Sequence, residues 1–183
     1  NKRGVVRRAK GDLDGAISDF NSAIKYVYAG EEHLPYFNRG LTLYDKGDFD
    51  GAIQDYNEVI RLQPDYFNAY FNRGLARKSK DDIEGALKDF TETIRLQPDH
   101  ATAYENRGLV RLNRGELDGA IKDFTETIRL APDYVNAYSS RGSAWFNKGV
   151  YYSAVADYEK YFELGGKAKT VKKLLNEAKK KIK

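Results

Sequence analysis

The sequence predicts an all-α array of stacked helical hairpins, and three observations lead to that prediction. An arginine–glycine pair recurs along the chain, most often every 34 residues, an alanine follows each glycine after twelve residues, and an aromatic residue follows each alanine after four. Small residues let two antiparallel helices approach closely. A single hairpin of this size cannot bury its own apolar face, so successive hairpins must stack.

Five copies of this pattern cover most of the chain. The glycines are Gly4, Gly40, Gly74, Gly108 and Gly142. The alanines are Ala16, Ala52, Ala86, Ala120 and Ala154, and the aromatic residues are Phe20, Tyr56, Phe90, Phe124 and Tyr158. The interval from the first copy to the second is 36 residues and every later one is 34, so a chance origin is very improbable.

Within each copy, one helix is expected around the glycine and a second around the alanine. The turns between them are expected at Lys46-Gly47, Arg114-Gly115 and Lys148-Gly149, and acids at the start of the second helices complement the positive helix terminus: Asp48, Asp82 and Glu116. A proline ends three of the second helices, and the aspartate after it is predicted to cap the next helix: Asp65, Asp99 and Asp133. In the first copy, residues 28–32 are expected to lengthen the connecting turn.

The repeat pattern resembles that of the tetratricopeptide repeat (TPR) family, W-x2-L-G-x2-Y followed by A-x3-F and a proline. Its counterparts in the second copy are Tyr36, Arg39, Gly40, Leu43, Ala52, Tyr56 and Pro64. The resemblance implies a right-handed superhelical solenoid. The units would span residues 1–32, incomplete at its start, and then 33–66, 67–100, 101–134 and 135–168.

Residues 169–183 are predicted to form a C-terminal capping helix. One face would carry Val171, Leu174, Leu175, Ala178 and Ile182, with lysines elsewhere. A solvating cap over the last repeat is the favoured interpretation. The alternative is a basic amphipathic helix that contacts an anionic membrane or nucleic acid.

Composition and charge exclude several classes of protein. Residues 167–183 hold eight lysines and one acid, net +7, which leaves −3 for residues 1–166 of a chain whose net charge is +4. Such a distribution does not favour a nucleic-acid footprint along the array. The chain has no cysteine, which excludes disulfides and thiol chemistry. It has no methionine, so we expect it to be a piece of a longer protein.

Neither an enzyme active site nor a cofactor site can be identified in the sequence. His33 and His100 are the only histidines, no phosphate-binding glycine loop is present, and no nucleophile stands beside a base. We therefore expect no catalysis, metal, cofactor or small-molecule substrate. No apolar run is long enough to span a membrane and no signal peptide is seen. The compartment is not identified, with the cytoplasm as the default, and the oligomeric state is not indicated.

An arginine repeats just before each glycine, and an aspartate follows it by 16 residues in every copy. The arginines are Arg3, Arg39, Arg73, Arg107 and Arg141, and the aspartates are Asp19, Asp55, Asp89, Asp123 and Asp157. The arginines could form a cationic stripe for an acidic ligand. The favoured interpretation is a salt bridge within each hairpin, because the two positions face each other when the turn lies near the middle of the unit.

The resemblance to TPR proteins also implies a concave groove lined by the first helix of each unit. The peptide-binding residues it implies are Phe37, Asn38, Leu41, Tyr44, Phe71, Asn72, Leu75, Lys78, Glu105, Asn106, Leu109, Leu112 and Phe146. The asparagine amides would hold a peptide backbone and the aromatic residues would anchor its side chains. The alternative is that these residues contact a neighbouring helix or solvent.

The favoured function is therefore a non-catalytic protein–protein interaction scaffold that binds an extended peptide segment of a partner in this groove. One alternative is a regulatory or substrate-docking module of a larger enzyme. Another is association with nucleic acid or a membrane through the lysine-rich C-terminal helix. Neither nucleic acid nor membrane is the expected partner. Of the lysine and asparagine positions that hold a terminal carboxylate in chaperone-binding members of the family, only one asparagine position is matched here, so this kind of binding is not expected.

Overall fold

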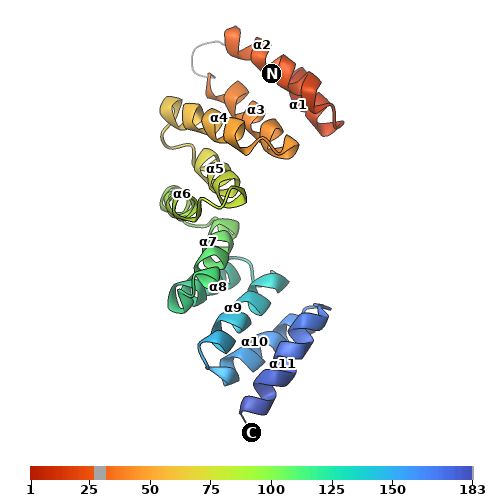
Figure 1. The fold of residues 1–183 in the computed structure, drawn as a ribbon, viewed down its shortest axis with the longest axis vertical. Coiled ribbons are helices and arrows are strands. Elements are labelled where there is room, and N and C mark those ends of the chain that lie inside the picture. Colours follow the sequence, from red (N-terminus) through yellow and green to blue (C-terminus); the bar gives the residue numbers. More distant parts are fainter. Residues whose placement is uncertain (27–31, 183) are drawn as a thin grey trace. The chain divides into compact units, whose positions relative to one another are not determined.

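The structure is a computed structural model that describes residues 1–26 and 32–182, and within them it contains eleven α-helices and no strands (Figure 1). The predicted all-α class is confirmed. The helices are α1 (Lys2–Ala9), α2 (Leu13–Lys25), α3 (His33–Lys46), α4 (Phe49–Leu62), α5 (Phe67–Ser79), α6 (Ile83–Leu96), α7 (Ala101–Asn113), α8 (Leu117–Leu130), α9 (Val135–Asn147), α10 (Tyr151–Glu163) and α11 (Lys169–Lys181). The chain divides into two compact units, Asn1–Pro98 and Asp99–Lys183, which are described separately below.

Consecutive helices form hairpins, and the hairpins stack within each unit. The first unit holds α1–α2, α3–α4 and α5–α6, with α2 packed on α3 and α4 on α5. The second holds α7–α8 and α9–α10, with α8 packed on α9 and α11 packed on α10 (Figure 1). The residue limits of the five repeats remain a prediction.

The recurring glycine explains how closely the two helices of a hairpin approach. A Cβ atom added to Gly74 would lie 2.8 Å from Cε1 of Phe90, and one added to Gly108 would lie 2.8 Å from Cε1 of Phe124. Both rings are fully buried. A side chain at the glycine would have to displace the ring that forms the centre of the hairpin core.

The acids predicted at the starts of the second helices, Asp48, Asp82 and Glu116, all occupy N-cap positions, and two of them form side-chain capping bonds. Oδ1 of Asp48 accepts a hydrogen bond from the Gly51 amide at 3.0 Å, and Asp82 does the same for Gly85. Glu116 occupies the N-cap position of α8 without a side-chain capping bond.

The prediction that the aspartate after each proline caps the next helix is wrong for Asp65, Asp99 and Asp133. The N-cap residues of α5, α7 and α9 lie one position later, at Tyr66, His100 and Tyr134. In two cases the proline and the aspartate are the two central residues of a hydrogen-bonded turn. The amide of Tyr66 donates to the Gln63 carbonyl, and the amide of Tyr134 donates to the Ala131 carbonyl. Proline is favoured at the second position of such a turn, which places the aspartate inside it.

Helix α11 covers apolar side chains at the end of the second unit. Val171, Leu175 and Ala178 are buried in a cluster with Tyr158 and Tyr161 of α10. The lysines of this helix are exposed. None of the helices in residues 1–26 and 32–182 is both long enough and apolar enough to cross a membrane. The predicted long turn at 28–32 lies, except for its last residue, outside the described residues.

The turns inside the hairpins require a left-handed backbone conformation. Gly47 has φ = 84° and Gly149 has φ = 80°, whereas the corresponding position in the third hairpin holds Asp81 at φ = 62°. Asp81 is the one residue other than glycine with a positive φ among those described. A Cβ atom is disfavoured in this region, so Asp81 carries a local conformational cost.

We expect Asp81→Gly to raise the free energy of unfolding by about 0.5–1 kcal/mol, because glycine adopts this conformation without steric cost. Urea denaturation followed by circular dichroism measures the change. Gly47→Asp is the matched control and should lower stability by a similar amount. A destabilised Asp81→Gly variant would contradict this explanation of the turn.

Candidate functional site

In the first unit, the residues predicted to line a groove lie on the adjacent helices α3 and α5, which contact each other directly. Every one of them is half-buried: Phe37, Asn38, Leu41 and Tyr44 on α3, and Phe71, Asn72, Leu75 and Lys78 on α5. The hydroxyl of Tyr44 lies 3.4 Å from that of Ser79, which links the ends of the two helices. The structure therefore brings these two rows of residues together on one surface, called here the α3–α5 surface.

The aromatic side chains of this surface also pack inward. The ring of Phe37 lies 6.0 Å from that of Tyr56 and 5.1 Å, edge to face, from that of Tyr66. Tyr44 lies 5.3 Å from Phe49, a further contact between a first and a second helix. Each ring thus has a buried side that holds the hairpin together and an exposed side.

The asparagines predicted to hold a peptide backbone, Asn38, Asn72 and Asn106, donate amide hydrogens within the protein. Nδ2 of Asn72 donates to the Asn68 carbonyl at 2.7 Å, and Nδ2 of Asn106 donates to the Thr102 carbonyl at 2.9 Å. Nδ2 of Asn38 instead donates to the side chain of Asn1 at 3.1 Å. These bonds fix the orientation of the amide groups.

In the second unit, the predicted residues lie on α7 and α9 and are half-buried as well: Glu105, Asn106, Leu109 and Leu112 on α7, and Phe146 on α9. The hydroxyl of Tyr134 donates to Oε2 of Glu105 at 2.7 Å. Burial, together with the nearby Glu105 carboxylate, raises the pKa of Tyr134 to about 12. The carboxylate is therefore held in place at this surface.

The arginine–aspartate pairs predicted from their spacing of 16 residues are formed in all five hairpins. Arg73 is representative: its Nε and Nη2 atoms donate to the two carboxylate oxygens of Asp89 at 3.0 and 2.6 Å. The aspartates are buried, and the arginines of the second to fifth hairpins are partly buried. The arginines therefore act within the hairpins and do not form a stripe for an acidic ligand.

Three of these arginines also contact the preceding hairpin, which the sequence did not predict. Nη1 of Arg39 donates to Oδ1 of Asn21 at 2.5 Å, and Nη1 of Arg73 donates to Oδ1 of Asn57 at 2.6 Å. In the second unit, Nη1 of Arg141 donates to the hydroxyl of Thr125 at 3.2 Å, across the interface between hairpins. The guanidinium carbon of each of these arginines also lies over the ring of the tyrosine three residues earlier in the same helix. For Arg73, this carbon is 5.4 Å from the centroid of the Tyr70 ring.

A second arginine joins the aspartate in three of the five hairpins. Nη1 of Arg77 lies 2.9 Å from Asp89 and Nη1 of Arg111 lies 2.8 Å from Asp123. Arg7 holds the corresponding place beside Asp19 at 3.4 Å. Leu43 and Trp145 stand at this position in the other two hairpins.

Two of the aspartates have pKa values shifted in opposite directions. Burial raises the pKa of the Asp55 carboxyl above its ordinary value, although hydrogen bonds from Arg39 oppose that shift. The pKa of Asp19, which contacts both Arg3 and Arg7, is lowered, chiefly by the hydrogen bond from Arg3. At Asp55 the effect of burial on the carboxylate therefore outweighs the hydrogen bonds from Arg39.

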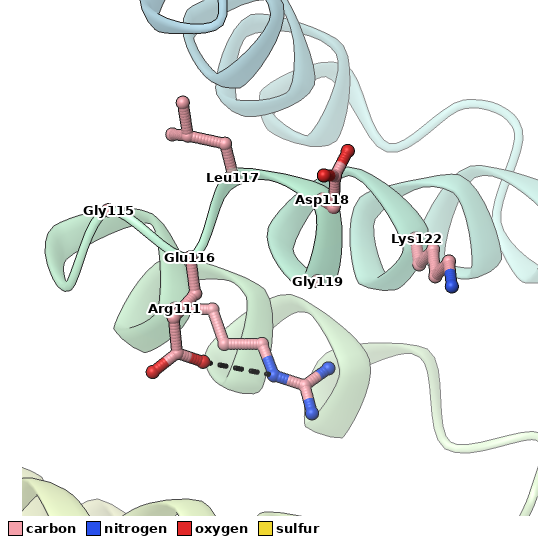
Figure 2. Close-up of a pocket in the computed structure, with 7 residues that line it drawn as sticks. All are labelled: Arg111, Gly115, Glu116, Leu117, Asp118, Gly119 and Lys122. Carbon is pink, nitrogen blue, oxygen red and sulfur yellow. Dashed lines mark ion pairs between the residues drawn. The ribbon is translucent and has the colours of Figure 1, made fainter.

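An open depression of about 490 Å³ lies at the turn between α7 and α8 (Figure 2). It is lined by Arg111, Gly115, Glu116, Leu117, Asp118, Gly119 and Lys122. Nε of Arg111 lies 3.9 Å from a Glu116 oxygen, drawn as the dashed line in Figure 2, and Asp118 pairs with Lys148. Because its carboxylates already have cationic partners, this depression does not present the charge of one sign that a small ion needs.

Metal binding was not expected from the sequence. No group of three or more histidine, cysteine, aspartate or glutamate side chains in the described part of the chain is arranged to hold a metal ion.

Family models match much of the chain. A model described as TPR repeat matches residues 40–81, and a tetratricopeptide repeat model matches residues 71–135 and 112–167. Comparison with curated protein sequences finds no significant match.

Solved structures resemble the chain over most of its length. A crystal structure of MamA is 31% identical, covers 88% of this chain and 93% of its own, and has a TM-score of 0.82. A MamA fragment from Desulfovibrio magneticus RS-1 is 20% identical, with coverages of 89% and 91% and a TM-score of 0.81. YrrB, described as a TPR protein with an unusual peptide-binding site, is 17% identical, with coverages of 97% and 88% and a TM-score of 0.78. The last two likenesses concern the fold alone.

We expect Arg39→Met to lower the free energy of unfolding by about 3–5 kcal/mol, because it leaves the buried Asp55 carboxylate without a cation. Arg73→Met should cost less, because Arg77 still contacts Asp89. Chemical denaturation of the two variants measures the difference. Equal losses for both substitutions would show that the second arginine does not compensate the carboxylate.

Proposed function

The chain belongs to the tetratricopeptide repeat family, and we propose that it is a non-catalytic scaffold that binds an extended peptide segment of a protein partner along the first helices of its hairpins. The family assignment itself supports a protein-interaction scaffold. Two relatives add to this support: YrrB is described as having a peptide-binding site, and Cut9 forms a hetero-tetramer with Hcn1.

The observation that carries the proposal is the α3–α5 surface. Phe37, Leu41 and Tyr44 on α3 and Phe71 and Leu75 on α5 are all partly exposed. Four of them, Phe37, Leu41, Tyr44 and Phe71, also pack on the hairpin cores. Rigid aromatic and aliphatic side chains that keep one side open are suitable anchors for the apolar side chains of a peptide, because little conformational entropy is lost on binding.

The asparagines supply a complementary polar contact. With Nδ2 of Asn38 and Asn72 bonded within the protein, the carbonyl oxygen of each amide is left to accept a hydrogen bond from a peptide N–H group. Such a bond depends on the peptide backbone and not on its side chains. The surface would therefore select apolar residues through its rings while tolerating varied residues between them.

The second unit would contact a more polar segment. Glu105, held by Tyr134, and Asn106 stand on α7 beside the partly exposed Leu109 and Leu112. A partner segment that contacts this surface is expected to carry a cationic or hydrogen-bond-donating residue opposite Glu105. The same surfaces would serve a docking module within a larger enzyme.

The lysine-rich helix is a weaker candidate for the main function. The apolar face of α11 is packed on α10, so that face is already used inside the second unit. A basic amphipathic helix that inserts into a membrane interface needs this face for burial among the lipids. The packing of α11 therefore favours its role as part of the fold.

We expect Leu75→Lys to weaken peptide binding at least tenfold, because it places a charge among the apolar anchors of the α3–α5 surface. The probe is a 12-residue peptide selected from a random display library on the wild-type protein, and its dissociation constant is measured by fluorescence anisotropy.

Leu87→Lys is the matched control, since Leu87 is also a half-buried leucine but lies on the second helix α6. This variant should keep the wild-type affinity, with circular dichroism confirming that both variants are folded. Unchanged binding by a folded Leu75→Lys variant, or an equal loss in both, would count against the proposed surface.

A further inference from the structure

A cavity of about 210 Å³ opens on the first unit where α2, α3 and α4 meet. Its lining includes Asn21 of α2, Arg39 and Leu43 of α3, and Gly51 and Asp55 of α4. None of these residues belongs to the α3–α5 surface. The proposed function therefore assigns no role to this cavity.

The corresponding positions in the first and third hairpins show which chemical group this cavity would accommodate. Arg77 stands at the position of Leu43, and its Nη1 atom lies 2.9 Å from Oδ2 of Asp89 and 3.4 Å from the carbonyl oxygen of Gly85. In the first hairpin, Nη1 of Arg7 likewise donates to the carbonyl oxygen of Gly15, at 3.2 Å. The site is thus formed by a buried carboxylate and a glycine carbonyl that together accept from one guanidinium group.

The glycine beneath the arginine also has a function in the sister hairpins. A Cβ atom added to Gly85 would lie 2.8 Å from Cδ of Arg77, and one added to Gly119 would lie 3.0 Å from Cδ of Arg111. The glycine gives the arginine stem room to pass. The glycine is kept in the first and second hairpins as Gly15 and Gly51, where the three atoms nearest to an added Cβ atom belong to the N-cap aspartates Asp12 and Asp48.

The second hairpin therefore keeps the two accepting groups, the Asp55 carboxylate and the Gly51 carbonyl, and lacks the second arginine. The side chain of Asp55 is only 5% exposed and is paired with Arg39 through both carboxylate oxygens. A carboxylate can accept about four hydrogen bonds, so Asp55 retains capacity for a second donor. Leu43 is apolar and carries no donor that could use it.

We propose that this cavity is a receptor site for the guanidinium group of an arginine side chain presented by a protein partner. Arginine is expected to fit better than lysine, because the third hairpin places a guanidinium group here whose Nη1 atom donates to both the carboxylate and the glycine carbonyl, and the planar group fixes the directions of those two hydrogens. The exposed Gln54 at the cavity's rim leaves the approach from solvent open. The fifth hairpin differs, because the half-buried Trp145 occupies the corresponding position.

The probe for the test is N-acetyl-L-arginine amide, titrated into ¹⁵N-labelled protein at constant ionic strength and followed by amide chemical shifts. A dissociation constant on the order of a millimolar is expected for so small a ligand. The shifts should be saturable and centred on Gly51, Gln54 and Asp55. The lysine analogue should bind more weakly, and the neutral citrulline analogue should not bind.

Two matched variants make the test specific. Leu43→Arg supplies the missing group from within the chain and should weaken probe binding at least tenfold. Arg77→Leu converts the third hairpin to the arrangement of the second and should create a new binding response at Gly85 and Asp89. Unaltered binding in Leu43→Arg, equal binding of the citrulline analogue, or no saturable shift in wild type would each overturn the proposal. These outcomes do not depend on whether the α3–α5 surface binds a peptide.

Discussion

The pairing of an arginine on the first helix with a buried aspartate on the second is the interaction on which the rest of the structure depends. Each aspartate is removed from water, and an unpaired buried carboxylate would be costly. The arginine satisfies it with two parallel hydrogen bonds, which also fixes the two helices of the hairpin relative to each other. The remaining nitrogen, Nη1, of Arg39, Arg73 and Arg141 donates a hydrogen bond to the preceding hairpin. A single arginine side chain therefore links the two helices of its own hairpin and also links that hairpin to the one before it.

This use of the arginines shapes what the protein can bind. Because their guanidinium groups are engaged inside the hairpins, the first-helix surfaces are left with half-exposed rings, leucines and amides as their distinctive groups. Such a surface suits a peptide with apolar anchors better than a phosphate or an acidic ligand. The second and fifth hairpins lack the additional arginine, since Leu43 and Trp145 replace it, and Asp55 is left with Arg39.

Much of the fold was predictable because its determinants recur within single repeats. The 34-residue spacing of glycine, alanine and aromatic residues indicated the helices, and the spacing of 16 residues indicated the arginine–aspartate pairs. The features that the sequence did not predict depend on other contacts. The bonds to Asn21 and Asn57 cross between hairpins, and the turn over Pro64 that displaces the expected cap at Asp65 is a local geometry that the charge pattern does not show. The groove residues came from the family resemblance, and their role as a site stays a prediction.

A double-mutant cycle on Arg141 and Asp157 tests the central role of the pair most directly, because here a single arginine faces the aspartate through Nε and Nη2 at 2.8 and 2.7 Å. The free energy of unfolding is measured for Arg141→Met, Asp157→Leu and the double variant. If the pair is the constraint described here, Arg141→Met alone is strongly destabilising and the double variant recovers much of that loss, with a coupling energy of about 1–3 kcal/mol. Additive losses with no coupling would contradict this account.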